Sequence, residues 1–380
     1  MRVLMTGGGT GGHVNPAIAI ADTIKQNDPT AEIAFVGTPR GIENKLVPAA
    51  GYKLYHVDVR GIRRSLSPAN IRAAWLALTS PIKAKKLIRE FRPDLVVGTG
   101  GYVSWPVVKA AAGMGIATAL HESNAAPGMT VKMLSGAVDR IYLNFSSAGN
   151  AIREKDKLMT VGCPMKSVGA SVPKSEARRR LGIPDSVSCV ILSFGGSLGA
   201  EKVNDAVFTL MERFSGGREG VWHTHATGSI EKDIAAGWFK ERGLDRYSNL
   251  EISEYIYDMP LRMAAADIVI CRAGAMTVSE LALMGKCAVF IPSPNVTDDQ
   301  QYKNAKALAD GGAAVIIREN AETGATLCKT VERLYSSPEV RRDMEEKIKK
   351  FASPNANRDI YNDLVRLVKS KESKKSKERK

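Results

Sequence analysis

The chain has 380 residues, which at a typical domain size of ~150 residues suggests two domains. Hydrophobic residues make up 44% and charged residues 25%, values that exclude a largely disordered or fibrous protein. The net charge of +14 indicates an anionic partner, such as nucleic acid, a phospholipid surface or a phosphorylated substrate.

Short apolar runs alternate with longer helical stretches in the first half of the chain. Runs that are almost continuously apolar are typical of parallel strands buried on both faces. We expect strands at Arg2–Thr6, Glu32–Gly37, Lys53–Asp58, Asp94–Gly98, Ile116–Leu120 and Asp139–Leu143. Helices fit between them, for example at Pro16–Gln26 and Ile71–Phe91.

The same alternation restarts after about Val161. The expected strands are Ser188–Phe194, Val221–Ala226, Leu250–Ser253, Asp267–Ile270, Cys287–Ile291 and Ala313–Ile317. The sequence therefore predicts an α/β protein with two Rossmann-like, doubly wound domains that face a cleft. We place the domains at residues 1–162 and 163–350, followed by a helix within 351–368 that returns toward the first domain. Residues 369–380 form a basic tail that we expect to be disordered.

The cysteines and the apolar segments bear on the cellular compartment. The five cysteines lie far apart and form no Cys-x-x-Cys pair, so neither a disulfide framework nor a zinc site is predicted. The start of the chain has no signal-peptide pattern, and no apolar run reaches the ~18 residues that span a bilayer. We expect a cytoplasmic protein without a membrane span.

A glycine-rich turn, GGGTGGH, follows the first expected strand. Gly7, Gly9 and Gly12 satisfy G-x-G-x-x-G, but no acid ends the second strand, so NAD binding is a distant alternative. The glycines let a ligand approach the N–H groups at the helix start. There, the positive helix end favours a neutral His13 imidazole suited to general-base catalysis. A histidine that only caps the helix is the alternative.

Polar residues also follow two further strands of the first half. Residues 98–104 contain Tyr102, and residues 121–124 contain Glu122 and Asn124. Because the carboxyl ends of parallel strands share one edge, we expect these loops on the same rim as His13. A simple turn and a helix cap are the alternatives for the two loops.

The second half repeats the arrangement of strand, glycine turn and helix. The turn at 195–199 offers backbone donors and the Ser197 hydroxyl to a phosphate, and the turn at 272–274 precedes a second helix. Glu280, one turn into that helix, could accept hydrogen bonds from a ribose diol, or could be a glutamate favoured by the helix dipole. Gln300 and Gln301 supply amides for sugar hydroxyls. The chain contains no Asp-x-Asp motif, which disfavours a metal-bridged diphosphate.

Together these loops closely resemble the bacterial peptidoglycan N-acetylglucosaminyltransferases over about residues 1–350. The matching blocks are GGGTGGHVNPAIAIA, GGYVSWP, HESNAAPG, GGSLGAEKVN, HATG, YIYDMP, CRAGAMTVSE and QQYKNA. The resemblance implies the GT-B glycosyltransferase fold and an inverting, metal-independent transfer with no cofactor. N-acetylglucosamine would pass from UDP-N-acetylglucosamine to the C4 hydroxyl of undecaprenyl-pyrophosphoryl-MurNAc-pentapeptide (lipid I), giving lipid II.

The resemblance also implies roles for individual residues. His13 and Glu122 would be catalytic, and which of them is the base stays open. The acceptor would contact Thr10, Gly11, Gly12, Tyr102 and Asn124. The donor would contact Lys166, Ser197, Tyr255, Ile256, Arg272, Gly274, Thr277, Glu280, Gln300 and Gln301. Ser197 would face the diphosphate, Glu280 the ribose, and Tyr255 and Ile256 the uracil, while the glutamines would hold the sugar.

Three residues depart from the family pattern. Ser123 stands where many members carry Gln, and Tyr257 replaces a frequent Asp. Lys166 stands where an Arg is common, which keeps the charge but loses the bidentate geometry. None of these departures removes the implied chemistry.

Lipid I lies in the cytoplasmic leaflet, so the resemblance implies a peripheral protein at the cytoplasmic face of the bacterial plasma membrane. An apolar stripe at helical spacing followed by lysines is a candidate patch for anionic lipid. Its residues are Ile71, Trp75, Leu78, Ile82, Lys83, Lys85 and Lys86. A core-facing stripe with a solvated basic side is the alternative.

Two rival functions remain at this point. A sugar-nucleotide 2-epimerase shares the architecture but needs no lipid acceptor. A basic protein that binds membrane or nucleotide without turnover would also fit the charge. The sequence shows no nucleic-acid motif, so we expect no nucleic-acid partner, whereas other cell-wall synthesis proteins are partners that the resemblance implies.

Overall fold

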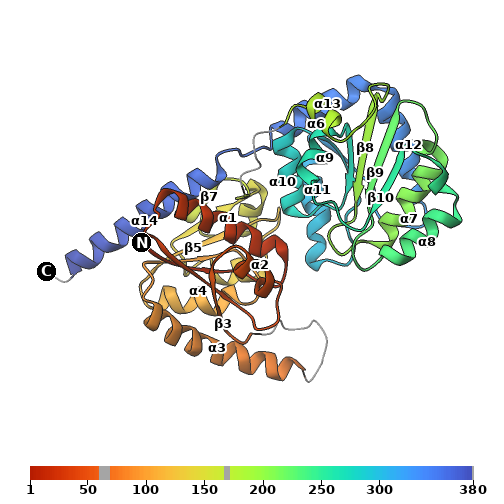
Figure 1. Cartoon of the computed structure of the whole chain (residues 1–380). Helices are drawn as coiled ribbons and strands as arrows, with labels where there is room; N and C mark the ends of the chain where they lie inside the picture. Colours follow the sequence, from red (N-terminus) through yellow and green to blue (C-terminus); the bar gives the residue numbers. More distant parts are fainter. Residues whose placement is uncertain (60–68, 167–171, 379–380) are drawn as a thin grey trace. The chain divides into compact units, whose positions relative to one another are not determined.

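A computed structural model describes residues 1–59, 69–166 and 172–378, and for residues 69–78, 375 and 378 it describes the backbone alone. The chain forms two compact units. Unit 1 comprises Met1–Ser167 and Ser353–Lys380, and unit 2 comprises Val168–Ala352. Each unit is a parallel sheet with helices packed against it (Figure 1).

The sheet of unit 1 has the strand order β3-β2-β1-β4-β5-β6-β7. Its strands are β1 (Arg2–Thr6), β2 (Glu32–Gly37), β3 (Lys53–His56), β4 (Leu95–Gly98), β5 (Ala117–Glu122), β6 (Arg140–Leu143) and β7 (Leu158–Thr160). β5 runs two residues further than predicted, so Glu122 ends the strand. The edge strand β7 was not predicted. Its three residues are too few to form a recognisable apolar run, and none of them is fully buried.

The helices of unit 1 are α1 (Gly11–Asn27), α2 (Glu43–Ala49), α3 (Ala69–Phe91), α4 (Ser104–Gly113), α5 (Met129–Leu134) and α14 (Ala356–Glu378). α1 starts five residues before the predicted helix, because glycine has a low helix propensity and conceals the start in the sequence.

Helix α14 differs from the prediction at its C-terminal end. It runs through Glu378, ten residues beyond the predicted end of the last helix at residue 368. The helix packs along α1 (Figure 1). Asp363 accepts hydrogen bonds from Arg140 Nε (2.8 Å) and the Tyr142 hydroxyl (2.9 Å), which fix the helix to β6. Asn357 Nδ2 donates to the Met165 carbonyl (2.8 Å), which holds the end of the first segment in unit 1.

The sheet of unit 2 has the order β10-β9-β8-β11-β12-β13. Its strands are β8 (Cys189–Phe194), β9 (Val221–Ala226), β10 (Leu250–Ser253), β11 (Ile268–Cys271), β12 (Cys287–Phe290) and β13 (Ala314–Ile316). Its helices are α6 (Lys174–Arg180), α7 (Glu201–Leu210), α8 (Lys232–Glu241), α9 (Met259–Ala265), α10 (Ala275–Met284), α11 (Gln300–Ala309), α12 (Thr323–Ser336) and α13 (Pro338–Lys349).

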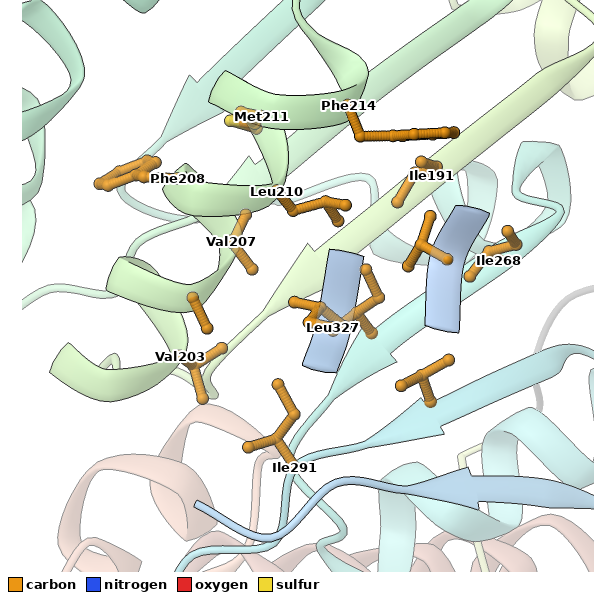
Figure 2. Packing of buried hydrophobic residues seen from close by; sticks show 14 of the residues in the cluster. Ile191, Val203, Val207, Phe208, Leu210, Met211, Phe214, Ile268, Ile291 and Leu327 are labelled. Carbon is orange, nitrogen blue, oxygen red and sulfur yellow. The ribbon is translucent and has the colours of Figure 1, made fainter. Parts of the chain in front are cut away.

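The core of unit 2 lies where α7 and α12 meet the sheet (Figure 2). Val203 and Val207 stand four residues apart on α7, so they face the sheet together. Ile191 of β8, Ile268 of β11 and Leu327 of α12 are fully buried in the same cluster. This packing fixes the start of α7, which follows one of the glycine turns.

Both sheets reverse their strand order at one place, between β1 and β4 in unit 1 and between β8 and β11 in unit 2. Chain connections leave in opposite directions there, so the loops at the carboxyl ends of the strands leave room for a ligand. The glycine turns identified in the sequence follow these four strands.

Candidate active site

The loops after β1 and β4 are tied together in unit 1. The Gly8 N–H donates to the Gly100 carbonyl (3.3 Å), and Thr99 Oγ1 donates to the His13 carbonyl (2.6 Å). A Cβ at Gly101, whose φ is +81°, would lie 2.3 Å from the Gly8 carbonyl oxygen. Glycine is therefore needed where the two backbones approach each other.

His13 lies in the first turn of α1 with a partly buried imidazole. Its Nδ1 is 3.1 Å from the Gly8 carbonyl oxygen and 3.3 Å from Thr10 Oγ1. Because a carbonyl only accepts hydrogen bonds, a neutral ring carries its proton on Nδ1 and keeps the lone pair on Nε2. The other side of the ring rests against Gly100, where a Cβ would lie 2.8 Å from Nε2. This arrangement suits a general base.

Glu122 ends β5 with a buried carboxylate. Oε1 accepts hydrogen bonds from the Asn124 N–H (2.9 Å) and side-chain amide (3.1 Å), and Oε2 accepts one from the Gly128 N–H (2.7 Å). Burial raises the pKa of this carboxyl, although these hydrogen bonds act in the opposite direction. Both oxygens are engaged, so Glu122 is arranged to shape residues 124–128.

The residues predicted to bind the acceptor are all at least partly exposed in unit 1. They are Thr10, Gly11, Gly12, Tyr102 and Asn124. Tyr102 stands out with 60% of its surface exposed. Ser123, which departs from the family pattern, is buried, with its hydroxyl 3.3 Å from His121 Nδ1, so its side chain does not point toward solvent.

Glu43, at the start of α2, supports the glycine turn and was missed in the sequence analysis. The side chain is fully buried, and Oε2 accepts a hydrogen bond from the Gly9 N–H (3.0 Å). Oε1 accepts from the Thr38 N–H (2.8 Å) and hydroxyl (2.7 Å). Burial acts to raise the pKa of Glu43, but the hydrogen bonds from Thr38 and Gly9 outweigh it and lower the pKa.

We expect Glu43→Gln to lower the free energy of unfolding by about 1–3 kcal/mol at neutral pH, because an amide nitrogen then faces a backbone donor. A carboxyl with a depressed folded-state pKa stabilises the fold above its ordinary pKa of 4.5 and loses this effect as the pH falls through the lower folded value. The free energy of unfolding, measured by urea denaturation, should therefore differ between wild type and variant at neutral pH. The difference should shrink in acid. A difference independent of pH would contradict this assignment.

In unit 2, the turn after β8 is held by the chain after β9. The Ser229 N–H donates to the Ser197 carbonyl (3.2 Å). The Ser197 side chain is exposed. Gly228 and Gly199 are so close that a Cβ at Gly228 would lie 2.0 Å from the Gly199 nitrogen. The turn leads into α7, so its N–H groups and the Ser197 hydroxyl can accommodate an anion.

The turn after β11 leads into α10, with Gly274 at the N-cap. Thr277 and Glu280 are partly exposed on this helix, and burial raises the pKa of the Glu280 carboxyl. The Arg272 side chain is engaged within unit 2. It donates to the Ile291 carbonyl (3.0 Å) and pairs with Glu319 (2.6 Å), so it ties the turn to the ends of neighbouring strands.

Two aromatic side chains follow β10. Tyr255 is 50% exposed and Tyr257 91% exposed, and their rings meet edge to face with centroids 5.0 Å apart. Ile256 between them is buried. An exposed aromatic face of this kind can stack on a planar base.

The remaining donor-side residues lie in two places. Gln300 and Gln301 begin α11, directly after Asp298 and Asp299, whose positive φ angles (56° and 52°) strain the backbone. Gln301 Oε1 accepts a hydrogen bond from the Ser293 N–H (2.9 Å) and so holds the chain after β12. Lys166 is exposed near the end of the first segment of unit 1.

The candidate membrane patch is described only in part. Ile82 is 69% exposed on α3, and Lys83, Lys85 and Lys86 are exposed beside it. Ala84 and Ile88 form the buried face of this part of the helix. The side chains of Ile71, Trp75 and Leu78 lie outside the described residues.

Within residues 1–59, 69–166 and 172–378, no helix combines the length and the apolar character needed to cross a membrane. The same ranges hold no group of three or more His, Cys, Asp or Glu side chains placed to bind a metal ion.

Comparison with known proteins defines the class. Residues 3–143 match the glycosyltransferase family 28 N-terminal domain, and residues 190–360 match the glycosyltransferase family 28 C-terminal domain. A crystal structure of Acinetobacter baumannii MurG is similar at a TM-score of 0.75 and 29% identity, covering 96% of this chain and 99% of that one. A UDP-GlcNAc 2-epimerase from Neisseria meningitidis bound to UDP-GlcNAc shares the fold at a TM-score of 0.67 and 14% identity, over 96% of this chain and all of the other. The two family 28 domains, together with the two parallel sheets, define a glycosyltransferase of the GT-B fold.

The sequence relatives are more specific. A protein of Acetivibrio thermocellus named UDP-N-acetylglucosamine--N-acetylmuramyl-(pentapeptide) pyrophosphoryl-undecaprenol N-acetylglucosamine transferase is 40% identical, over 98% of this chain and 99% of that protein. A protein of the same name from Lactococcus lactis subsp. cremoris is 37% identical, over 97% and 99%. The chain therefore belongs to glycosyltransferase family 28, within the family of these N-acetylglucosamine transferases. The resemblance and the fold class predicted from the sequence are confirmed.

Proposed function

We propose that the protein transfers N-acetylglucosamine from UDP-N-acetylglucosamine to the C4 hydroxyl of lipid I, with inversion, to give lipid II. The observation that carries the proposal is similarity along almost the whole chain to relatives named for this transfer, at 37–40% identity. The glycine turns at both switch points are consistent with an anionic, nucleotide-linked donor.

Unit 2 supplies the groups that suit the donor. The N–H groups at the starts of α7 and α10 would stabilise the diphosphate as it leaves, since fixed dipoles need no reorganisation during the reaction. The Glu280 carboxylate would accept hydrogen bonds from the ribose, and the exposed Tyr255 ring would stack on the uracil. Gln300 would contact the sugar.

Unit 1 supplies the base. The C4 oxygen of the acceptor attacks the anomeric carbon while His13 Nε2 takes its proton, and the bond from that carbon to the diphosphate oxygen breaks. A single displacement of this kind inverts the configuration. Of the two candidate bases we favour His13, because the Glu122 oxygens accept three hydrogen bonds from their own loop. Glu122 would then position Asn124 for the acceptor.

The direct test incubates the protein with UDP-N-acetylglucosamine and a lipid I analogue in the presence of EDTA, with products followed by mass spectrometry. Disaccharide-linked lipid together with UDP supports the proposal and its independence from metal. A 2-epimerised sugar nucleotide without disaccharide would favour the epimerase, whose solved structures share this fold at 14% identity. UDP binding without turnover would favour a non-catalytic binding protein.

We also propose that the enzyme works as a peripheral protein on the anionic cytoplasmic surface of the plasma membrane, where lipid I is found. Ile82 and the three neighbouring lysines on α3 support this, because an exposed apolar side chain among cations is typical of interfacial binding. Contacts with other cell-wall synthesis proteins are a further proposal that follows from the family.

We expect the triple variant Lys83→Glu, Lys85→Glu, Lys86→Glu to sediment less with phosphatidylglycerol vesicles than wild type, because lysines near an anionic surface each contribute about 1 kcal/mol. The control makes the same change in charge at exposed lysines of unit 2: Lys240, Lys329 and Lys350. Equal loss of sedimentation in both variants would show that net charge, and not this patch, drives binding.

A further inference from the structure

A line of buried polar side chains crosses the otherwise apolar core of unit 2. Its members come from β8, β9, α7 and the helical turn that follows α7, and each is at most 1% exposed. They are Ser215, His223, Ser193, His225 and Asn204, and together we call them the buried relay. None of them has a role in the proposed transfer.

The relay is hydrogen-bonded without a break. Ser215 Oγ is 3.0 Å from His223 Nδ1, and His223 Nε2 is 2.9 Å from Ser193 Oγ. Ser193 Oγ is 2.9 Å from His225 Nδ1, and His225 Nε2 is 3.0 Å from Asn204 Oδ1. Asn204 Nδ2 then donates to the Thr227 carbonyl (3.0 Å).

The last bond sets the direction of the bond between Asn204 and His225. Because Asn204 donates through Nδ2 to a carbonyl, its Oδ1 must accept the proton of His225 Nε2. His225 Nδ1 lies 2.9 Å from the Ser193 hydroxyl and 3.1 Å from the Ser193 carbonyl oxygen, and the His223 ring lies between the hydroxyls of Ser215 and Ser193. Burial lowers the pKa of both histidines, to about 4 for His225, which favours neutral rings in this core.

The relay ends at the turn assigned to the donor diphosphate. A Cβ at Gly199 would lie 2.4 Å from the Thr227 carbonyl oxygen, so this oxygen stands directly against the turn. Two residues further on, the Ser229 N–H donates to the Ser197 carbonyl (3.2 Å). The backbone that Asn204 holds is therefore the backbone that supports residues 195–199.

Apolar side chains surround the buried relay and could fill the same space. Phe208 packs edge to face on His225 at 5.7 Å, and Met211 and Phe214 are buried in the surrounding cluster (Figure 2). Buried polar networks whose members are all hydrogen-bonded hold one arrangement of the chain more strictly than apolar packing does.

We infer that the buried relay positions the turn at residues 195–199 for the donor diphosphate, so that its five members act as positioning residues for donor binding. The inference rests on the proposed function. Asn204 is the key member, since it joins α7, which begins at the turn, to the chain after β9, which supports the turn.

The test compares Asn204→Asp with Leu334→Ala. The aspartate keeps the shape and still accepts from His225, but it cannot donate to the Thr227 carbonyl. Leu334 is fully buried in the same core and lies outside the relay. We expect Asn204→Asp to weaken UDP binding at least about tenfold in calorimetry, in line with loss of a buried polar contact. Leu334→Ala lowers the melting temperature and leaves UDP affinity unchanged.

A second pair keeps the inference testable if Asn204→Asp does not fold. His225→Gln retains a side-chain N–H toward Asn204, whereas His225→Leu does not, so the glutamine variant should bind UDP more tightly than the leucine variant. Equal UDP affinity in this pair, or wild-type affinity in Asn204→Asp, would overturn the inference.

A readout without ligand separates this inference from the proposed function. Amide hydrogen exchange of residues 195–199 in the ligand-free protein should be faster in Asn204→Asp than in wild type and Leu334→Ala. Unchanged exchange would overturn the role of the relay. Faster exchange in Asn204→Asp, together with a wild-type protein that does not bind UDP, would keep the structural link and remove the proposed function.

Discussion

Replacing His13 by alanine is expected to lower kcat by about 10²–10⁴-fold, the usual contribution of a general base. The acceptor hydroxyl then has no group to take its proton as it attacks. Binding of UDP-N-acetylglucosamine should remain, because all the groups assigned to the donor except Lys166 are in unit 2. Steady-state kinetics with a lipid I analogue, together with calorimetric titration of UDP, measure the two effects separately.

His56→Ala is the matched control, since it removes another histidine of unit 1, an exposed one whose Nε2 is 2.8 Å from Asn44 Oδ1. It should leave kcat unchanged. If His13→Ala kept wild-type turnover while Glu122→Gln lost it, the base would be Glu122, and the argument from its three internal hydrogen bonds would be wrong.

Gly100→Ala should reduce kcat almost as strongly without removing any functional group. A Cβ at this position would lie 2.5 Å from His13 Cδ2, and its φ of +116° is one that L side chains rarely adopt. Either the imidazole or the loop after β4 must move. Because a displacement of about 1 Å can cost about 100-fold in rate, we expect kcat to fall by that order while UDP affinity is kept.

Gly113→Ala is the control for this change. Gly113 ends α4 in the same unit, and a Cβ there would meet no atom within 4 Å. It should have wild-type kinetics. Equal activity of Gly100→Ala and wild type would mean that the ring of His13 does not need its position against Gly100, which would contradict its role as the base.

The sheets were largely predictable because their central strands are buried on both faces and so form short apolar runs. Arg2–Thr6, Glu32–Gly37, Val221–Ala226 and Leu250–Ser253 were predicted with the bounds that the structure has. Incomplete burial did not always hide a strand, since Leu250–Ser253 is only partly buried. The edge strand β7 was missed, and the extension of α14 past Val368 was not expected, since a lysine-rich segment carries no apolar signal.

Candidate site residues could be identified in the sequence where they lie close to a glycine turn, and their roles stay predictions. Ser197 lies in a glycine turn after a strand, and His13 and Glu280 lie in the helices that follow such turns, positions that turn chemistry identifies. Glu43 was missed, because its bond to the Gly9 N–H joins residues 34 positions apart and depends on the order of the strands. For the same reason no pattern showed that Arg272 and Gln301 are hydrogen-bonded within unit 2.

The measurement that tests the central claim most directly is the dependence of UDP release on the acceptor. Purified protein and UDP-N-acetylglucosamine are followed by a coupled assay for UDP, with and without a lipid I analogue, and the disaccharide product is quantified in the same samples. We predict UDP release only when the acceptor is present, with one disaccharide formed per UDP. Equal release in its absence, or release without disaccharide, would contradict the proposed transfer.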